Sequence, residues 1–174
     1  AAMNIGILGG TFDPVHLGHV FIAERARRLF FLDQVWFMVA NIPPHKEKGS
    51  IGSPFHRYAM TVLALQKHRR LRASAWELER SGPSFTVETL DQLSRCRPQD
   101  RFCFIAGSDS LRDLHSWKDY DKLLLQYGLV FVQRPGEGVN LETLSLPGRL
   151  KEVIENVCPV TKRPIQPGRS FLID

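Results

Sequence analysis

Residues 3–19 read MNIGILGGTFDPVHLGH, and this stretch determines the expected fold. Its first part, residues 4–8, is a short apolar run that ends at Gly9 and Gly10, as a buried strand does. Apolar side chains then recur at helical spacing over residues 18–31, with charged side chains on the opposite face. A buried strand that turns through two glycines into an amphipathic helix predicts the start of an α/β domain.

The same alternation continues along the chain. Further buried strands are predicted at residues 35–40, 101–106, 129–132 and 170–173, with an extended segment at 71–78. Four more helices are predicted. One begins at Ser53 and Pro54, one begins near Ser84, one follows Trp117 and ends at Leu125, and the last covers about residues 144–157. Because strands alternate with helices, we expect a doubly wound (Rossmann-like) parallel sheet with helices on both faces.

A chain of 174 residues with 43% hydrophobic and 24% charged residues has the size and composition of one globular domain. We therefore expect a single domain over residues 1–174, with the two alanines ahead of Met3 as a cloning remnant. No run approaches the roughly 18 apolar residues of a membrane helix, and no signal peptide precedes Met3. The odd number of cysteines, in no CxxC arrangement, is typical of reduced thiols and predicts a cytoplasmic location.

The net charge of +5 is compatible with nucleic acid, acidic lipid or phosphorylated small molecules as partners. The densest basic run, KHRRLR at residues 67–72, contains no aromatic side chain and is better explained as a solvated helix end. We therefore expect neither nucleic acid nor a membrane as a partner, and favour small phosphorylated ligands.

Polar residues follow four of the predicted strands, at the point where each strand ends. The first strand is followed by Gly9, Gly10, Thr11 and two histidines, and the second by Asn41, His45 and Lys46. The strand at residues 101–106 is followed by Gly107, Ser108 and Asp109, and the strand at 129–132 by Arg134. Because ligands of doubly wound sheets bind beyond the carboxyl ends of the strands, these residues predict one shared site.

The loop after the first strand matches neither GxGxxG nor the P-loop, because the later glycines and the Gly-Lys-Ser/Thr element are missing. The residues after Pro14 begin a helix, and the free N–H groups at a helix start favour the binding of phosphate. His16 and His19 are three positions apart and lie on one face of the first turn. Gly18, between the histidines, is expected to leave room for a ligand. Taken alone, the two histidines are also compatible with a metal site that includes Asp13 or with a purely structural pair. The neighbouring loops favour the phosphate interpretation.

At these residues the chain resembles a known superfamily. Residues 9–19, GGTFDPVHLGH, are similar to the HxGH signature of the nucleotidyltransferases. Residues 41–46 (NIPPHK), 83–86 (PSFT), 107–111 (GSDSL) with Trp117, and 134–136 (RPG) resemble the successive motifs of the bacterial nicotinate-nucleotide adenylyltransferase family. The HxGH element alone is shared with phosphopantetheine adenylyltransferases and cytidylyltransferases, whereas the later motifs are far more selective. The resemblance runs in order over residues 3–136.

The resemblance implies transfer of AMP from ATP to nicotinate mononucleotide, giving deamido-NAD and pyrophosphate in NAD biosynthesis, with Mg²⁺ carried by ATP. It implies that His16 and His19 are catalytic. It implies that ATP is held by Gly9, Gly10, Thr11, Phe12, His16, Gly18, His19, Gly107, Asp109 and Ser110. It implies that the mononucleotide is held by Asn41, Lys46, Thr86, Trp117 and Arg134, with Trp117 stacked on the pyridine ring. No residue is implied as a metal ligand, and nothing indicates the oligomeric state.

The sequence departs from the family at three places. Phe85 stands where tyrosine is usual, and Lys118 follows Trp117 where an aromatic residue or histidine is usual. The family continues beyond the strand at 170–173 into a Ser/Thr-rich helix start and an arginine that bind the ATP phosphates, and this element is absent from the sequence. We expect a chain that lacks this element, with its charge-assisted hydrogen bonds, to bind the mononucleotide still. Its turnover should be at least about tenfold slower than that of a chain that contains the element.

Two alternative functions stay open on the sequence alone. The first is adenylyl transfer to another acceptor, either phosphopantetheine, which Trp117 and the PPHK loop disfavour, or nicotinamide mononucleotide, which differs by one amide. The second is a catalytically impaired nucleotide sensor, suggested by the missing C-terminal element. A serine hydrolase built on residues 107–110 is excluded, because GxSxG would require glycine at position 110 or 111.

Overall fold

The apolar run that precedes the two glycines forms the central strand of the sheet. The computed structural model describes residues 1–41, 51–134, 136, 138–157 and 162–173. In it, β1 (Asn4–Gly10) pairs in parallel with β2 (Gln34–Val39) on one side and with β4 (Arg101–Gly107) on the other. Both faces of β1 are covered, so its interior residues are buried without any polar alternation.

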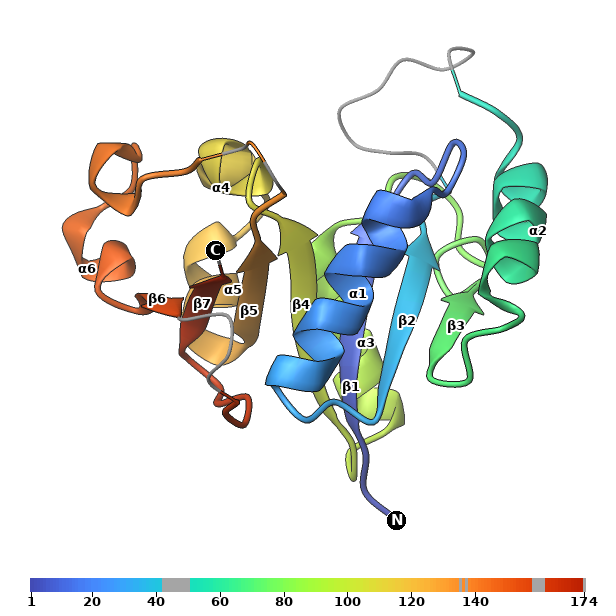
Figure 1. Ribbon diagram of the computed structural model, residues 1–174, viewed down its shortest axis with the longest axis horizontal. Coiled ribbons are helices and arrows are strands. Elements are labelled where there is room, and N and C mark those ends of the chain that lie inside the picture. The colour runs from blue at the N-terminus through green and yellow to red at the C-terminus, as the bar shows by residue number, and fades with distance from the viewer. Residues whose placement is uncertain (42–50, 135, 137, 158–161, 174) are drawn as a thin grey trace.

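Among the described residues the sheet has seven strands in the order β3-β2-β1-β4-β5-β7-β6, and neighbouring strands pair in parallel. The remaining strands are β3 (Leu71–Ser74), β5 (Gly128–Val132), β6 (Ile154–Val157) and β7 (Ser170–Ile173). Their carboxyl ends point to one edge of the sheet, the upper edge in Figure 1. The doubly wound α/β fold expected from the sequence is confirmed.

Helices connect the strands and cover the sheet. They are α1 (Leu17–Leu29), α2 (Pro54–Leu65), α3 (Thr86–Cys96), α4 (Ser110–Asp113), α5 (Tyr120–Gln126) and α6 (Gly148–Lys151), with short 3₁₀ turns η1 (Leu114–Ser116) and η2 (Leu141–Thr143). In Figure 1, α1 lies on the near face of the sheet and α3 behind it. In the part of the chain that the structure describes, none of the helices could span a bilayer.

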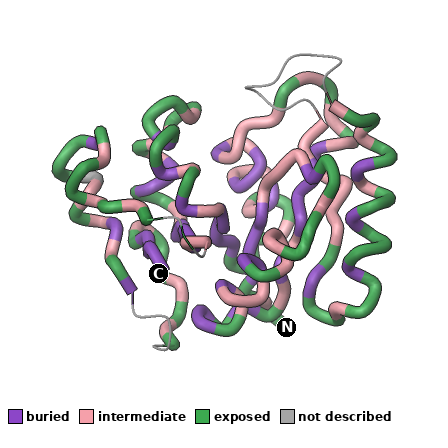
Figure 2. Tube along the Cα trace, turned by 45° about the horizontal axis from the view of Figure 1, so that its top comes forward, coloured by how far each residue is buried: buried purple, intermediate pink, exposed green. Residues whose placement is uncertain are grey.

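The core consists of two apolar layers, one on each face of the sheet. Side chains of alternate strand residues point to opposite faces, so Ile5 and Ile7 pack toward α3 and α5, whereas Leu8 packs toward α1. On the α1 side the layer includes Ala23 and Ala26, which let the helix approach the strands closely. Figure 2 shows the buried segments running along the strands, with exposed residues on the outer surface.

Two of the predicted elements were wrong. The helix predicted over residues 144–157 is instead the short α6 followed by strand β6. Its apolar residues occur at helical spacing, but β6 pairs along its whole length with β7, and this pairing buries Ile154 and Val157. The extended segment predicted at 71–78 ends at Ser74, and a turn follows in which the Leu78 N–H donates to the Ala75 carbonyl.

Candidate active site

The two histidines of the HxGH element form the N-terminal cap of α1. His16 is the N-cap residue, and its Nδ1 accepts the Gly18 N–H at 3.1 Å. The backbone N–H of His16 in turn donates to Nδ1 of His19 at 3.1 Å. This reciprocal arrangement is a capping box made of two imidazoles, whose rings stack with centroids 3.7 Å apart. Since both Nδ1 atoms accept, the neutral rings carry their protons on Nε2.

His19 is held neutral by its surroundings. Burial, with smaller effects from the charges of His16 and Arg134, lowers the pKa of His19 from 6.5 to about 4. The ring also rests edge-on against Phe12, with centroids 4.9 Å apart. A neutral imidazole with a fixed tautomer is a hydrogen-bond donor through Nε2 near pH 7, so His19 can donate to an anionic group without first losing or gaining a proton.

Phe12 and Gly18 lie against the rings of the two histidines. The Phe12 side chain is 2% exposed, has a backbone φ of 51°, and packs between His19 and Phe37. A positive φ at a bulky residue is strained, and such strain is typical of loops held in place for function. At Gly18, a Cβ atom would come within 2.9 Å of the His16 ring. The space at Gly18, expected from the sequence to admit a ligand, is therefore taken by the His16 imidazole.

A buried arginine on α2 fixes the loop that leads into the histidines. Arg57 is 1% exposed, and its Nη1 donates to the carbonyls of Thr11 and Ala40 at 2.7 Å each. Its Nε donates to the Gly52 carbonyl at 2.9 Å and its Nη2 to the Asn41 carbonyl at 3.1 Å. One planar guanidinium thus joins the ends of β1 and β2 to the start of α2.

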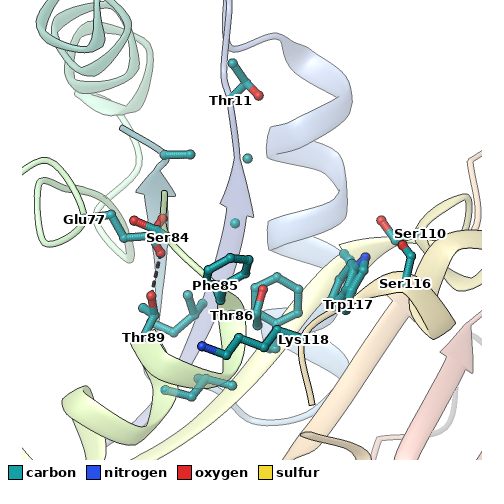
Figure 3. A pocket seen from close by; sticks show the side chains of 17 residues that line it. Thr11, Glu77, Ser84, Phe85, Thr86, Thr89, Ser110, Ser116, Trp117 and Lys118 are labelled. Atoms are coloured by element: carbon teal, nitrogen blue, oxygen red, sulfur yellow. Dashed lines mark hydrogen bonds between the residues drawn. The ribbon is translucent and has the colours of Figure 1, made fainter. Parts of the chain in front are cut away.

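A cavity of about 210 Å³ opens beside this loop, on the α3 face of the sheet. Its floor includes Ile7, Phe104 and Ala106 from the strands, and Gly9, Gly10 and Thr11 border it on the histidine side. Figure 3 shows the labelled polar and aromatic side chains that surround it. Residues 9–11 line the cavity and lead directly into the histidine cap, so the cavity and the start of α1 adjoin each other.

Aromatic side chains form the wall of the cavity near α3. Phe85 and Trp117 both line it, and the Trp117 ring packs edge-on against Phe104 with centroids 5.6 Å apart. Thr86, the first residue of α3, lies between them in Figure 3. Lys118 completes this wall, with its Nζ 4.9 Å from the centroid of the Phe85 ring. A flat ring fits against such a surface, which can stack on it and attract a charge.

A buried carboxyl group stands in another part of the cavity wall. Glu77 is 8% exposed, and its Oε2 accepts the Thr89 hydroxyl of α3 at 2.8 Å. Burial raises the pKa of the Glu77 carboxyl, while Thr89, Arg80 and Ser84 act in the opposite direction. This hydrogen bond ties the turn after β3 to α3, the helix that begins at Thr86.

The structure brings together most of the residues that the sequence singled out. Gly9, Gly10, Thr11, Thr86, Ser110 and Trp117 all line the cavity, and His16 and His19 stand at the start of α1. Gly107 and Asp109 lie beside Arg134, since a Cβ on Gly107 would be 2.5 Å from Asp109 Oδ1 and 3.8 Å from Arg134 Nη2.

Two residues predicted to hold the mononucleotide, Asn41 and Arg134, are not part of the cavity lining. Arg134 is close enough to His19 to influence its pKa, which puts its charge on the histidine side of the site. Its Nε is buried and has no hydrogen-bond partner among the described residues. The Asn41 side chain donates to the Arg80 carbonyl at 2.9 Å. Lys46 lies outside the described residues.

Several cavity residues were not predicted, chiefly Glu77, Ser84, Thr89, Ser116 and Lys118. Glu77 sits in a turn that had been expected to be extended, and Thr89 lies on the face of α3 that looks purely structural in sequence. Two of them carried a signal: Lys118 as the unusual residue after Trp117, and Ser84 as part of the PSFT motif at residues 83–86. Within the described ranges, no group of three or more His, Cys, Asp and Glu side chains could hold a metal ion.

Comparison with known proteins identifies the family. Residues 7–167 match the family model described as Cytidylyltransferase-like. A Thermus thermophilus protein named "Probable nicotinate-nucleotide adenylyltransferase" is 46% identical over 134 residues, which are 77% of this chain and 71% of that protein. An Oceanobacillus iheyensis protein of the same name is 44% identical over 133 residues, which are 76% of this chain and 69% of that protein.

Solved structures of low sequence identity share the fold. The Plasmodium falciparum nicotinic acid mononucleotide adenylyltransferase complexed with NaAD superimposes with a TM-score of 0.70 at 21% identity, covering 87% of this chain and 80% of that one. The same enzyme complexed with APC gives a TM-score of 0.67 at 20% identity, covering 87% and 79%. With its histidine-capped helix and its adjoining aromatic cavity, the chain belongs to the nicotinate-nucleotide adenylyltransferase family of cytidylyltransferase-like proteins.

Proposed function

We propose that this chain transfers the AMP group of ATP to nicotinate mononucleotide, forming deamido-NAD and releasing pyrophosphate in NAD biosynthesis. The observation that carries the proposal is the continuity of the site. The stretch Gly9–Gly10–Thr11 borders the aromatic cavity on one side and leads to the histidine cap on the other. One substrate with a flat ring and one with phosphates can therefore meet at this stretch. The names of the relatives, including the enzyme complexed with NaAD, agree with this assignment.

The proposed reaction needs no general base. The phosphate of a mononucleotide is already largely dianionic near pH 7, because its second pKa is about 6. One of its oxygens attacks the α-phosphorus of ATP, a new P–O bond forms, and the bond from the α-phosphorus to the bridging oxygen breaks as pyrophosphate leaves. Catalysis then depends on alignment of the two substrates and on donors that stabilise charge on the transferring group. A carboxylate beside the histidines is not required.

In this proposal the Nε2–H groups of His16 and His19 donate to the phosphates of ATP, together with free N–H groups at the start of α1. Gly107, Asp109 and Ser110 accept the adenosine part. Thr86 and Trp117 hold the pyridine ring, while Asn41, Lys46 and Arg134 act on the rest of the mononucleotide. Mg²⁺ would enter the site bound to the triphosphate of ATP and would neutralise the negative charge of the leaving pyrophosphate.

We also propose that residues 1–174 work as a single nucleotidyltransferase domain in the cytoplasm. One continuous sheet from β3 to β6 supports the first point. The second is supported by the free thiols of Cys96 and Cys103, since reduced cysteines are usual in that compartment.

Pyrophosphate release tests the proposed reaction. The chain is incubated with ATP, Mg²⁺ and, in separate reactions, nicotinate mononucleotide, nicotinamide mononucleotide or phosphopantetheine. We expect the fastest release with nicotinate mononucleotide and none above background when EDTA replaces Mg²⁺. Release with another acceptor but not with nicotinate mononucleotide would refute the proposal.

A further inference from the structure

The cavity wall contains a positively charged side chain next to its aromatic surface. Among the described residues that line the cavity, Lys118 is the only lysine or arginine. Its Nζ lies over the Phe85 ring and donates to Glu88 Oε1 at 2.5 Å. Hydrogen bonding to Glu88 raises the pKa of Lys118, so the side chain stays charged near pH 7. The pocket for a flat ring is thus bordered by a permanent cation.

We propose that Lys118 determines the specificity of this cavity, because its ammonium group favours a pyridine ring that bears a carboxylate over one that bears an amide. This inference rests on the proposed function and deepens it. Nicotinate and nicotinamide mononucleotides have the same ring, ribose and phosphate. Discrimination between them must come from groups that interact differently with a carboxylate and an amide, which makes specificity a difference between two affinities.

The cavity offers two charged groups that can make this difference. Glu77, buried and hydrogen-bonded to Thr89, favours an N–H donor and disfavours an anion if it is ionised. Lys118 does the opposite, because an ammonium group attracts a carboxylate more strongly than a neutral amide. The aromatic side chains around it are uncharged and cannot attract a carboxylate as an ammonium group does. Lys118 is therefore the side chain of the lining that favours the acid.

The ion pair with Glu88 does not prevent this role. The side chains of Lys118 and Glu88 are 45% and 36% exposed, and exposed ion pairs contribute little to stability. The ammonium group has three donors, so it can keep or leave Glu88 when a ligand carboxylate arrives. Glu88 then acts as a competitor of the ligand for Lys118, and removal of its charge should strengthen the preference for the acid.

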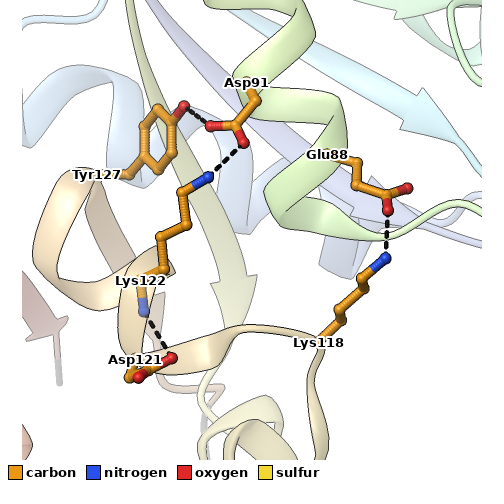
Figure 4. Close-up of polar contacts among 6 residues, drawn as sticks. All are labelled: Glu88, Asp91, Lys118, Asp121, Lys122 and Tyr127. Carbon is orange, nitrogen blue, oxygen red and sulfur yellow. Dashed lines mark hydrogen bonds and ion pairs between the residues drawn. The ribbon is translucent and has the colours of Figure 1, made fainter.

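A neighbouring ion pair provides a matched control. Lys122 donates to Asp91 at 2.7 Å, and its side chain is 40% exposed. Figure 4 shows the two pairs side by side, each linking α3 to the segment that follows η1. Lys122 does not line the cavity. If the Lys118–Glu88 pair were only a surface contact between the same two segments, loss of either lysine should have the same small effect.

The experiment compares kcat/KM for the nicotinate and nicotinamide mononucleotides in Lys118→Gln, Lys118→Arg, Glu88→Gln, Lys122→Gln and the unmodified chain. Dissociation constants for both mononucleotides are measured by calorimetry without ATP. We expect Lys118→Gln to lower the acid-to-amide ratio by about fivefold, the effect of one partly exposed charge contact. Lys118→Arg should retain most of the ratio, Glu88→Gln should raise it, and Lys122→Gln should leave it unchanged.

The opposite signs for Lys118→Gln and Glu88→Gln are decisive, because simple loss of an ion pair would shift the ratio in the same direction in both variants. An unchanged ratio in Lys118→Gln, or an equal loss for both mononucleotides, would overturn the inference. If the unmodified chain adenylates neither mononucleotide, the proposed function fails, while the affinity ratio without ATP still decides the role of Lys118. Failure to bind either mononucleotide would overturn both.

Discussion

The imidazole rings of His16 and His19 stack at 3.7 Å, and each ring uses its Nδ1 to accept a backbone N–H of the same helical turn. The cap therefore fixes the tautomer of both rings and leaves both Nε2–H groups as donors. Because the backbone holds the rings before any ligand arrives, little reorganisation is needed when charge develops on a phosphoryl group. The HxGH spacing thus has two physical purposes, since it caps the helix and aligns a pair of donors.

Replacement of His19 by alanine should reduce kcat far more than it changes the KM for ATP. A donor aimed at developing charge acts mainly in the transition state, and the loss of one such donor costs about 100-fold in rate. Steady-state kinetics, with folding checked by circular dichroism, measure this effect. His56→Ala, at an exposed position on α2, is the control and should keep the kcat of the unmodified chain. A nearly normal kcat with a raised KM would make His19 a ground-state binder.

The low pKa of His19 should also be visible in stability. Between pH 6.5 and about 4 the unfolded chain binds a proton at this position and the folded chain does not. The free energy of unfolding must therefore fall as the pH falls through this window, and the contribution is absent above it. We expect a plot of unfolding free energy against pH, from urea titrations, to be less steep in His19→Gln than in the unmodified chain. If the two proteins gave the same slope of unfolding free energy over about pH 4.5–6.5, which lies between the two pKa values of His19, the prediction would be contradicted.

Most of the fold could be predicted from the sequence because its strands are buried on both faces. Runs such as residues 101–106 and 129–132 are apolar without alternation, and each is followed by a turn, which leaves little ambiguity. The segment at 144–157 was ambiguous because its apolar spacing suits a helix. Residues 154–157 form a strand because they pair with β7, the next strand along the chain, and a pattern within one segment does not report its pairing with another.

The candidate site divides in the same way. The histidine cap, the residue 9–11 loop and Trp117 occupy one site, as expected from motifs that end neighbouring strands. Arg57 was missed because a polar residue within an amphipathic helix is normally exposed, whereas here its guanidinium is buried among carbonyl groups. Glu77 was missed because its partner Thr89 is on another element, and only the folded chain brings them together.

Arg57 should be essential for the stability of the β1–α1 loop. Arg57→Met would remove the buried guanidinium that donates to the partly buried carbonyls of Thr11, Ala40, Asn41 and Gly52. We expect the free energy of unfolding to fall by about 3 kcal/mol or more, as when one partner of a buried charged network is removed. Urea unfolding measures this, and Arg72→Met, at an exposed position on β3, is the control. A loss of stability no larger than that of the control would contradict the role.

Trp117 should act on the mononucleotide and not on ATP. It lines the cavity but also packs against Phe104, so Trp117→Ala removes both a part of the cavity wall and a packing contact. We expect a higher KM for nicotinate mononucleotide, because a cationic ring stacked on indole gains about 0.5–2 kcal/mol. The KM for ATP should stay within about twofold of normal, since ATP makes no such contact in the proposed arrangement. Trp117→Phe keeps the packing and should recover most of the affinity. An equal change in both KM values would make Trp117 purely structural.

A single competition reaction tests the central claim most directly. The chain is incubated with ATP, Mg²⁺ and equal concentrations of nicotinate mononucleotide, nicotinamide mononucleotide and phosphopantetheine in one tube, and the adenylylated products are identified by mass spectrometry at early times. We predict that deamido-NAD is the main product, that it forms in step with pyrophosphate, and that His19→Ala greatly reduces it. A different adenylylated product as the main species, or ATP consumption without any such product, would contradict the assignment.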